Sequence, residues 1–124
     1  MNDRIYRTLH LLQRSTFRSR FVLSARDLLY VDRKGLDVVR NHAFEFITAR
    51  ISPAFPFNDG KQTPMKNHPV FIAQHATATC CRSCIQKWHG IKKGIPLEDI
   101  DINFMVDLIM EWIKRQRIVA QWPI

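Results

Sequence analysis

Apolar side chains recur three and four residues apart in three separate parts of the chain, and this spacing restricts the fold more than any other feature. The longest series occupies residues 36–51, and shorter ones lie near the two ends. The members are Ile5, Leu9 and Leu12; Leu36, Val39, Ala43, Phe46, Ile47 and Ile51; and Phe104 or Met105, Leu108, Ile109, Trp112 and Ile113. Because residues three and four apart share one face of an α-helix, each series predicts a helix with a buried stripe.

Capping and turn residues indicate where such helices begin and end. Ser24 starts a capping-box-like sequence, and Gly35 can take the left-handed conformation that ends a helix. Residues 52–69 contain four prolines and few apolar side chains, which predicts a long loop. We therefore expect a mainly α fold: a single compact domain, residues 1–124, of five or six helices with one long Pro-rich loop and at most a short strand at residues 70–72.

The length and composition suit one folded domain outside the membrane. Hydrophobic residues make up 46% of the 124, with eight Phe and three Trp, which excludes a disordered polymer. No run approaches 18 uninterrupted apolar residues, and the N-terminus lacks the apolar core of a signal peptide. Three cysteines, an odd number with two adjacent, suit a reducing compartment. We expect a cytoplasmic protein with no membrane partner, of undetermined oligomeric state.

The formal net charge of +8 makes nucleic acid or another polyanion the leading partner. A small basic binding module without enzyme activity of its own is therefore the leading functional hypothesis. The alternative for these charges is that scattered arginines only solvate helix faces. The candidates for phosphate contact are Arg18, Arg20, Lys61, Lys66, Arg82, Lys92 and Lys93.

Residues 68–90 hold all three cysteines and three of the five histidines. Thiolate sulfur and imidazole nitrogen are the ligands that tetrahedral zinc prefers, and Cys81 and Cys84 have a chelating Cys-x-x-Cys spacing. With His75 before them and His89 after them, they form a candidate zinc site. A single unbroken helix would point His75 away from Cys81, so this site requires a helix break between them.

Two other interpretations of the cysteines stay open. Free cysteines are small apolar residues that often belong to the core. Alternatively, Cys80 or Cys81 is a nucleophile with His75 or His89 as its base, which would make the protein an enzyme with a Cys/His or zinc-dependent active site around residues 58–89.

Two long strings, Asn58-Asp-Gly-Lys-Gln-Thr-Pro-Met65 and His68-Pro-Val-Phe-Ile-Ala-Gln-His-Ala-Thr-Ala-Thr-Cys-Cys-Arg82, resemble a small bacterial family classed as a domain of unknown function. The similarity extends to Phe-Arg-Ser-Arg-Phe at residues 17–21 and Lys-Trp-His-Gly at residues 87–90, so it covers most of the chain. The resemblance implies a free-standing bacterial protein and assigns no activity or site residue.

Overall fold

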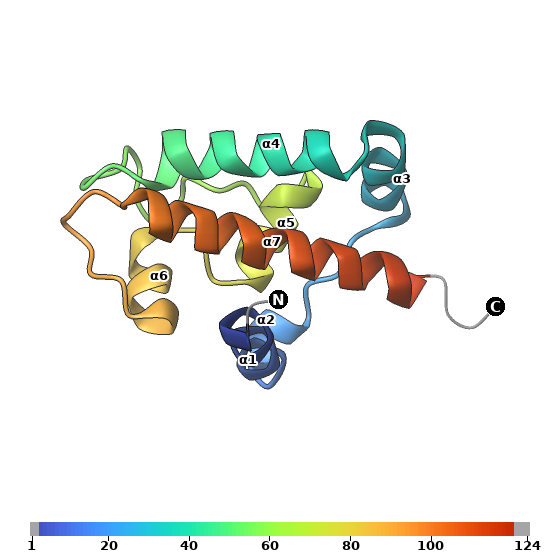
Figure 1. The fold of residues 1–124 in the computed structure, drawn as a ribbon, viewed down its shortest axis with the longest axis horizontal. Helices are drawn as coiled ribbons and strands as arrows, with labels where there is room; N and C mark the ends of the chain where they lie inside the picture. The colour runs from blue at the N-terminus through green and yellow to red at the C-terminus, as the bar shows by residue number, and fades with distance from the viewer. Residues whose placement is uncertain (1–2, 121–124) are drawn as a thin grey trace.

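The computed structural model describes residues 3–120, which form seven α-helices, one π-helical turn and no strand (Figure 1). The elements are α1 (Asp3–Gln13), α2 (Thr16–Ser19), α3 (Ala25–Lys34), α4 (Leu36–Phe46), η1 (Ile47–Ile51), α5 (Pro69–Ala76), α6 (Arg82–His89) and α7 (Asp99–Ala120). The predicted mainly α fold with one long loop is confirmed. The count is seven helices where five or six were expected, and α2 is a single turn that begins because the Ser15 side chain accepts the N–H of Arg18.

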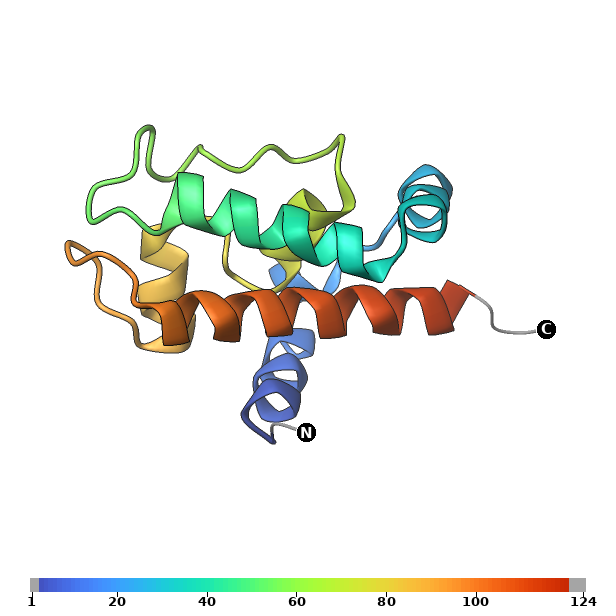
Figure 2. The same cartoon turned by 45° about the horizontal axis from the view of Figure 1, so that its top comes forward.

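The C-terminal helix α7 is the central element of the fold. Helices α4 and α7 lie side by side along the long axis, and α1 packs against α7 as well (Figures 1 and 2). A helix buried on more than one side lies inside a domain rather than on its surface. The whole predicted stripe of α7 is buried, and the full set of buried residues on this helix is Ile102, Phe104, Met105, Val106, Leu108, Ile109, Met110, Trp112 and Ile113.

Residues 70–72, where the sequence allowed a short strand, belong to helix α5. All eight residues of α5 are buried, and a short, continuously apolar run does not reveal helical periodicity. The residues at the N-terminus of α5 explain why this segment forms a helix and not a strand. Pro69 occupies the first turn, and His68 Nδ1 accepts the N–H of Val70 at 3.0 Å.

The long loop before α5 is fastened to the cysteine stretch by hydrogen bonds. Thr63 is buried, and its hydroxyl donates to the carbonyl of Cys80 at 2.8 Å. Asp59 Oδ1 accepts the N–H of Arg82, the first residue of α6, at 3.1 Å. The two strings that resemble one family are therefore in direct contact in the folded protein.

None of the helices within residues 3–120 combines the length and the apolar character needed to cross a membrane. Helix α7, with 22 residues, is long enough but carries charged residues along its length.

Candidate functional site

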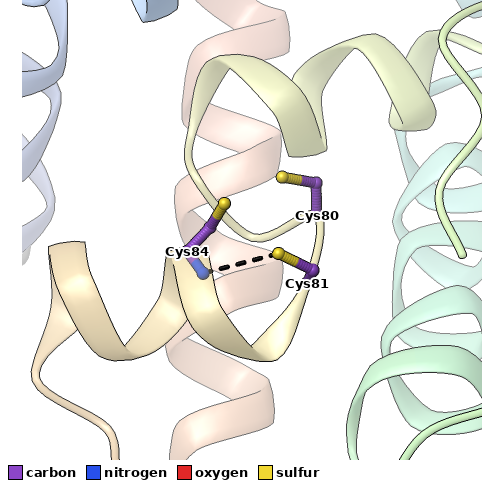
Figure 3. Close-up of side chains that lie close together, drawn as sticks. All are labelled: Cys80, Cys81 and Cys84. Atoms are coloured by element: carbon purple, nitrogen blue, oxygen red, sulfur yellow. Dashed lines mark hydrogen bonds between the residues drawn. The ribbon is translucent and has the colours of Figure 1, made fainter. Parts of the chain in front are cut away.

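The three cysteines converge where the chain turns from α5 into α6 (Figure 3). Their Sγ atoms all lie within 4.8 Å of one another, so together they can hold a metal ion. Cys81 caps α6: its Sγ accepts the N–H of Cys84 at 3.4 Å, the dashed line in Figure 3. Cys80 and Cys81 are each 7% exposed, whereas Cys84 is half-buried. No disulfide joins them, since all three are free thiols.

The turn between the two helices places Cys80 beside Cys84. Helix α5 ends at Ala76, and Ala78 takes a left-handed φ of 57° that reverses the chain direction. The turn is held internally, because the Thr77 hydroxyl donates to the carbonyl of Ala73 at 2.7 Å and the N–H of Thr79 donates to the carbonyl of Gln74 at 2.9 Å. The helix break that the zinc interpretation required is therefore present.

Arg18 on helix α2 reaches the cysteines from a distant part of the chain. Its side chain is 9% exposed, and Nη2 donates to Cys84 Sγ at 3.1 Å. Nη1 donates to the carbonyl of His75 at 2.7 Å and lies 3.6 Å from Cys80 Sγ. The site is thus three sulfur atoms with one buried guanidinium bound to two of them.

Hydrogen bonds within the cluster favour a thiolate at Cys84. Bonds from the Cys80 and Cys81 thiols hold the pKa of Cys84 well below its ordinary value; burial opposes this, and the Arg18 hydrogen bond and charge reinforce it. Hydrogen bonding to Cys81 and Cys84, together with burial, raises the pKa of Cys80. The pKa of Cys81 is also raised: the bond with Cys80 lowers it, but the bond to Cys84 and burial outweigh this. The structure therefore favours Cys84 as the thiolate, whereas the sequence singled out Cys80 and Cys81.

The two histidines of the predicted zinc site lie outside the sulfur cluster. His75 is buried with Nε2 3.1 Å from the carbonyls of both Thr63 and Pro64, and its ring stacks on Phe21. His89 Nε2 lies 2.9 Å from the carbonyl of Thr77, and burial lowers the pKa of His89. Of the expected ligands His75, Cys81, Cys84 and His89, the structure brings together only the two cysteines, and adds Cys80.

Two of the seven predicted phosphate contacts are interior residues. Arg82 is fully buried, and its guanidinium donates to the carbonyls of Pro53, Ile95 and Lys92 at 2.7, 2.7 and 3.1 Å. Arg18 is occupied by the cysteine site. This corrects the expectation that both guanidinium groups face an external polyanion, because a buried arginine uses its donors within the fold. The other five, Arg20, Lys61, Lys66, Lys92 and Lys93, are exposed.

The fold and the site define an all-α protein with three convergent cysteines and a buried arginine beside them. The family model described as "Domain of unknown function (DUF4186)" matches residues 6–114, and the chain belongs to this family. The match spans Arg18, the anchored loop and all three cysteines, and it confirms the resemblance found in the sequence. No solved structure matches the chain.

Proposed function

We propose that this protein binds a thiophilic metal ion, with zinc as the first candidate, through Cys80, Cys81 and Cys84. The observation that supports this most directly is that all three Sγ atoms lie within 4.8 Å of one another. Zinc–sulfur bonds of about 2.3 Å place the sulfur atoms of a tetrahedral site roughly 3.8 Å apart. Small side-chain movements therefore suffice to bring the three sulfur atoms onto one ion.

Arg18 has the charge and the contacts expected beside such a centre. Three thiolates around a divalent ion carry one net negative charge, and a guanidinium compensates it. N–H donors that contact ligating sulfur atoms orient the ligands and tune the metal. The contacts of Arg18 with Cys84 and Cys80 are of this kind.

The proposal includes the cytoplasmic location expected from the sequence, because cysteines in a reducing compartment stay free to bind a metal. Hydrogen bonds also position the site, because the Thr63 hydroxyl donates to the Cys80 carbonyl and the Cys84 N–H donates to Cys81 Sγ. A site that is ordered in advance loses less entropy when it binds its ion.

Metal analysis tests the proposal. Protein purified without chelator should contain about one zinc per chain, and each of Cys80→Ala, Cys81→Ala and Cys84→Ala should lose it, because a site is lost with any one ligand. His75→Gln and His89→Gln are the matched controls and should keep the metal. Metal-free protein whose melting temperature does not respond to zinc would favour the alternative in which the cysteines are only core residues.

A second candidate is an enzyme in which Cys84 is the nucleophile. The specific observation in its favour is the 3.1 Å hydrogen bond from Arg18 to Cys84 Sγ, together with the greater exposure of Cys84 than of the other two cysteines. Selective alkylation of Cys84 in metal-free protein is the expected result.

We also propose that the exposed basic residues of the surface bind a polyanion. Its support is the net charge of +8 and the exposure of five of the seven basic residues selected from the sequence. Lys92 and Lys93 lie together in the turn between α6 and α7, which makes them the pair to alter first.

A further inference from the structure

The proposed metal site has three protein ligands, and zinc in proteins takes four. Structural zinc sites are closed by four protein ligands, whereas reactive sites keep one position for a ligand from solution. Within residues 3–120, Cys80, Cys81 and Cys84 are the group whose ligand atoms come close enough to share one ion. The histidines that could have closed the site have Nε2 against backbone carbonyls. The protein ligands thus match the open type.

The surroundings of the cluster favour an anion as the additional ligand. The guanidinium of Arg18 lies against Cys84 and Cys80, so it is next to any molecule that joins the metal on that side. Cys84 is half-buried, the most exposed of the three cysteines, and Phe17 on α2 is 44% exposed. The Arg18 and Arg20 guanidinium carbons lie 5.0 and 4.6 Å from the Phe17 ring centroid. The surroundings of Arg18 therefore combine positive charge with an apolar ring.

We infer that the metal centre is open and that its fourth position takes a low-molecular-weight thiol, bound as the thiolate beside Arg18. This inference rests on the proposed function. Soft sulfur ligands suit an ion already held by thiolates, and four-thiolate zinc sites are common in proteins. Such a site carries two negative charges, and Arg18 reduces this to one. On binding, the metal–sulfur bond forms, the S–H bond of the thiol breaks and its proton passes to solvent, with no change in oxidation state.

Cobalt-loaded protein tests the inference, because Co²⁺ replaces Zn²⁺ and reports its ligands by absorption. Protein prepared without added thiol is titrated with 2-mercaptoethanol. We expect saturable growth of the sulfur-to-cobalt charge-transfer band by about one third, as three sulfur ligands become four. An unchanged spectrum would overturn the inference. Azide is the matched anion without sulfur, and azide binding as tight as that of the thiol would also overturn it.

The assay separates failure of the inference from failure of the proposed function. If wild-type protein binds no cobalt or zinc, or if Cys84→Ala binds them unchanged, the three-cysteine metal site itself is wrong. If cobalt binds with the charge-transfer bands of three thiolates but ignores 2-mercaptoethanol, only the open position is wrong.

Variants of Arg18 test its part in holding the added ligand. Arg18→Gln should weaken thiol binding about tenfold, the factor expected for one charge-assisted hydrogen bond, while cobalt stays bound. Arg18→Lys should restore part of the affinity because it keeps the charge. Arg33→Gln removes an exposed charge on α3, a helix that contributes nothing to the cysteine site, and is the control, with an expected change below about twofold. Unchanged thiol affinity in Arg18→Gln would overturn the role of Arg18. If that variant does not fold, the titration of the wild-type protein still tests whether the fourth position takes a thiol.

Discussion

Replacing Arg82 with methionine should destabilise the protein strongly, because Arg82 joins three separate segments of the chain. Its guanidinium is fully buried and donates to Pro53 after η1 and to Lys92 and Ile95 before α7. Each hydrogen bond from a charged donor contributes about 1.5–3 kcal/mol. Burying the charge of Arg82 has a desolvation cost, which is absent in the methionine variant and offsets about half of the sum of the three hydrogen bonds. We predict a net loss of the order of 3 kcal/mol in the free energy of unfolding.

Methionine is the suitable replacement because it retains most of the apolar stem and leaves little cavity. Urea denaturation of the metal-free protein measures the loss without a contribution from the cysteine site. Arg33→Met is the matched control: Arg33 is exposed on α3, and its replacement should change stability by less than about 0.5 kcal/mol. A loss below about 1 kcal/mol in Arg82→Met, with an unchanged urea dependence, would refute the role assigned to Arg82.

Three further predictions concern acid stability, thiol reactivity and charge. Burial, followed by the nearby His42, lowers the pKa of His68 to about 4, so folding favours the neutral imidazole. The free energy of unfolding should therefore fall as the pH drops from about 6.5 towards 4. His68→Asn should flatten this dependence in urea titrations at several pH values. In metal-free protein at pH 6, iodoacetamide should modify Cys84 first, and equal slow labelling of all three cysteines by mass spectrometry would contradict this. Duplex DNA binding, measured by fluorescence anisotropy, should weaken as the salt concentration rises. Changing Lys92 and Lys93 to Glu should weaken binding to all DNA sequences alike. No binding at about 50 mM salt would contradict the polyanion hypothesis.

The sequence predicted the helices well where local signals agree. The capping box of α3 is present, since the Ser24 hydroxyl accepts the N–H of Asp27 and the Asp27 carboxylate accepts the N–H of Ser24. Gly35 separates α3 from α4 with the positive φ that was predicted, 86°, but its ψ of 153° lies outside the left-handed helical region. Helix α5 was missed because a run buried on every side carries no amphipathic period.

The site was predicted only in part because its geometry depends on tertiary contacts. The Cys-x-x-Cys spacing is local, so Cys81 and Cys84 could be paired from sequence. Cys80 joins them through the left-handed turn at Ala78, a residue type that rarely adopts that conformation. Arg18 contacts Cys84 across 66 positions, and no spacing rule links residues so far apart.

The burial of two arginines likewise depends on tertiary contacts that the sequence does not reveal. Composition alone places arginine at the surface, where most arginines lie. Arg18 and Arg82 lie inside because thiol sulfur atoms and loop carbonyls satisfy their donors. A search of the sequence for basic residues does not distinguish them from Arg20, which is exposed.

Zinc-edge X-ray absorption spectroscopy tests the central claim most directly, because it counts the sulfur atoms on the metal. Protein prepared without chelator or added thiol should show about one zinc per chain with three sulfur ligands at about 2.3 Å. Cys80→Ala should abolish zinc binding. A spectrum of two sulfur and two imidazole nitrogen ligands, or zinc bound unchanged in Cys80→Ala, would contradict a centre built from Cys80, Cys81 and Cys84.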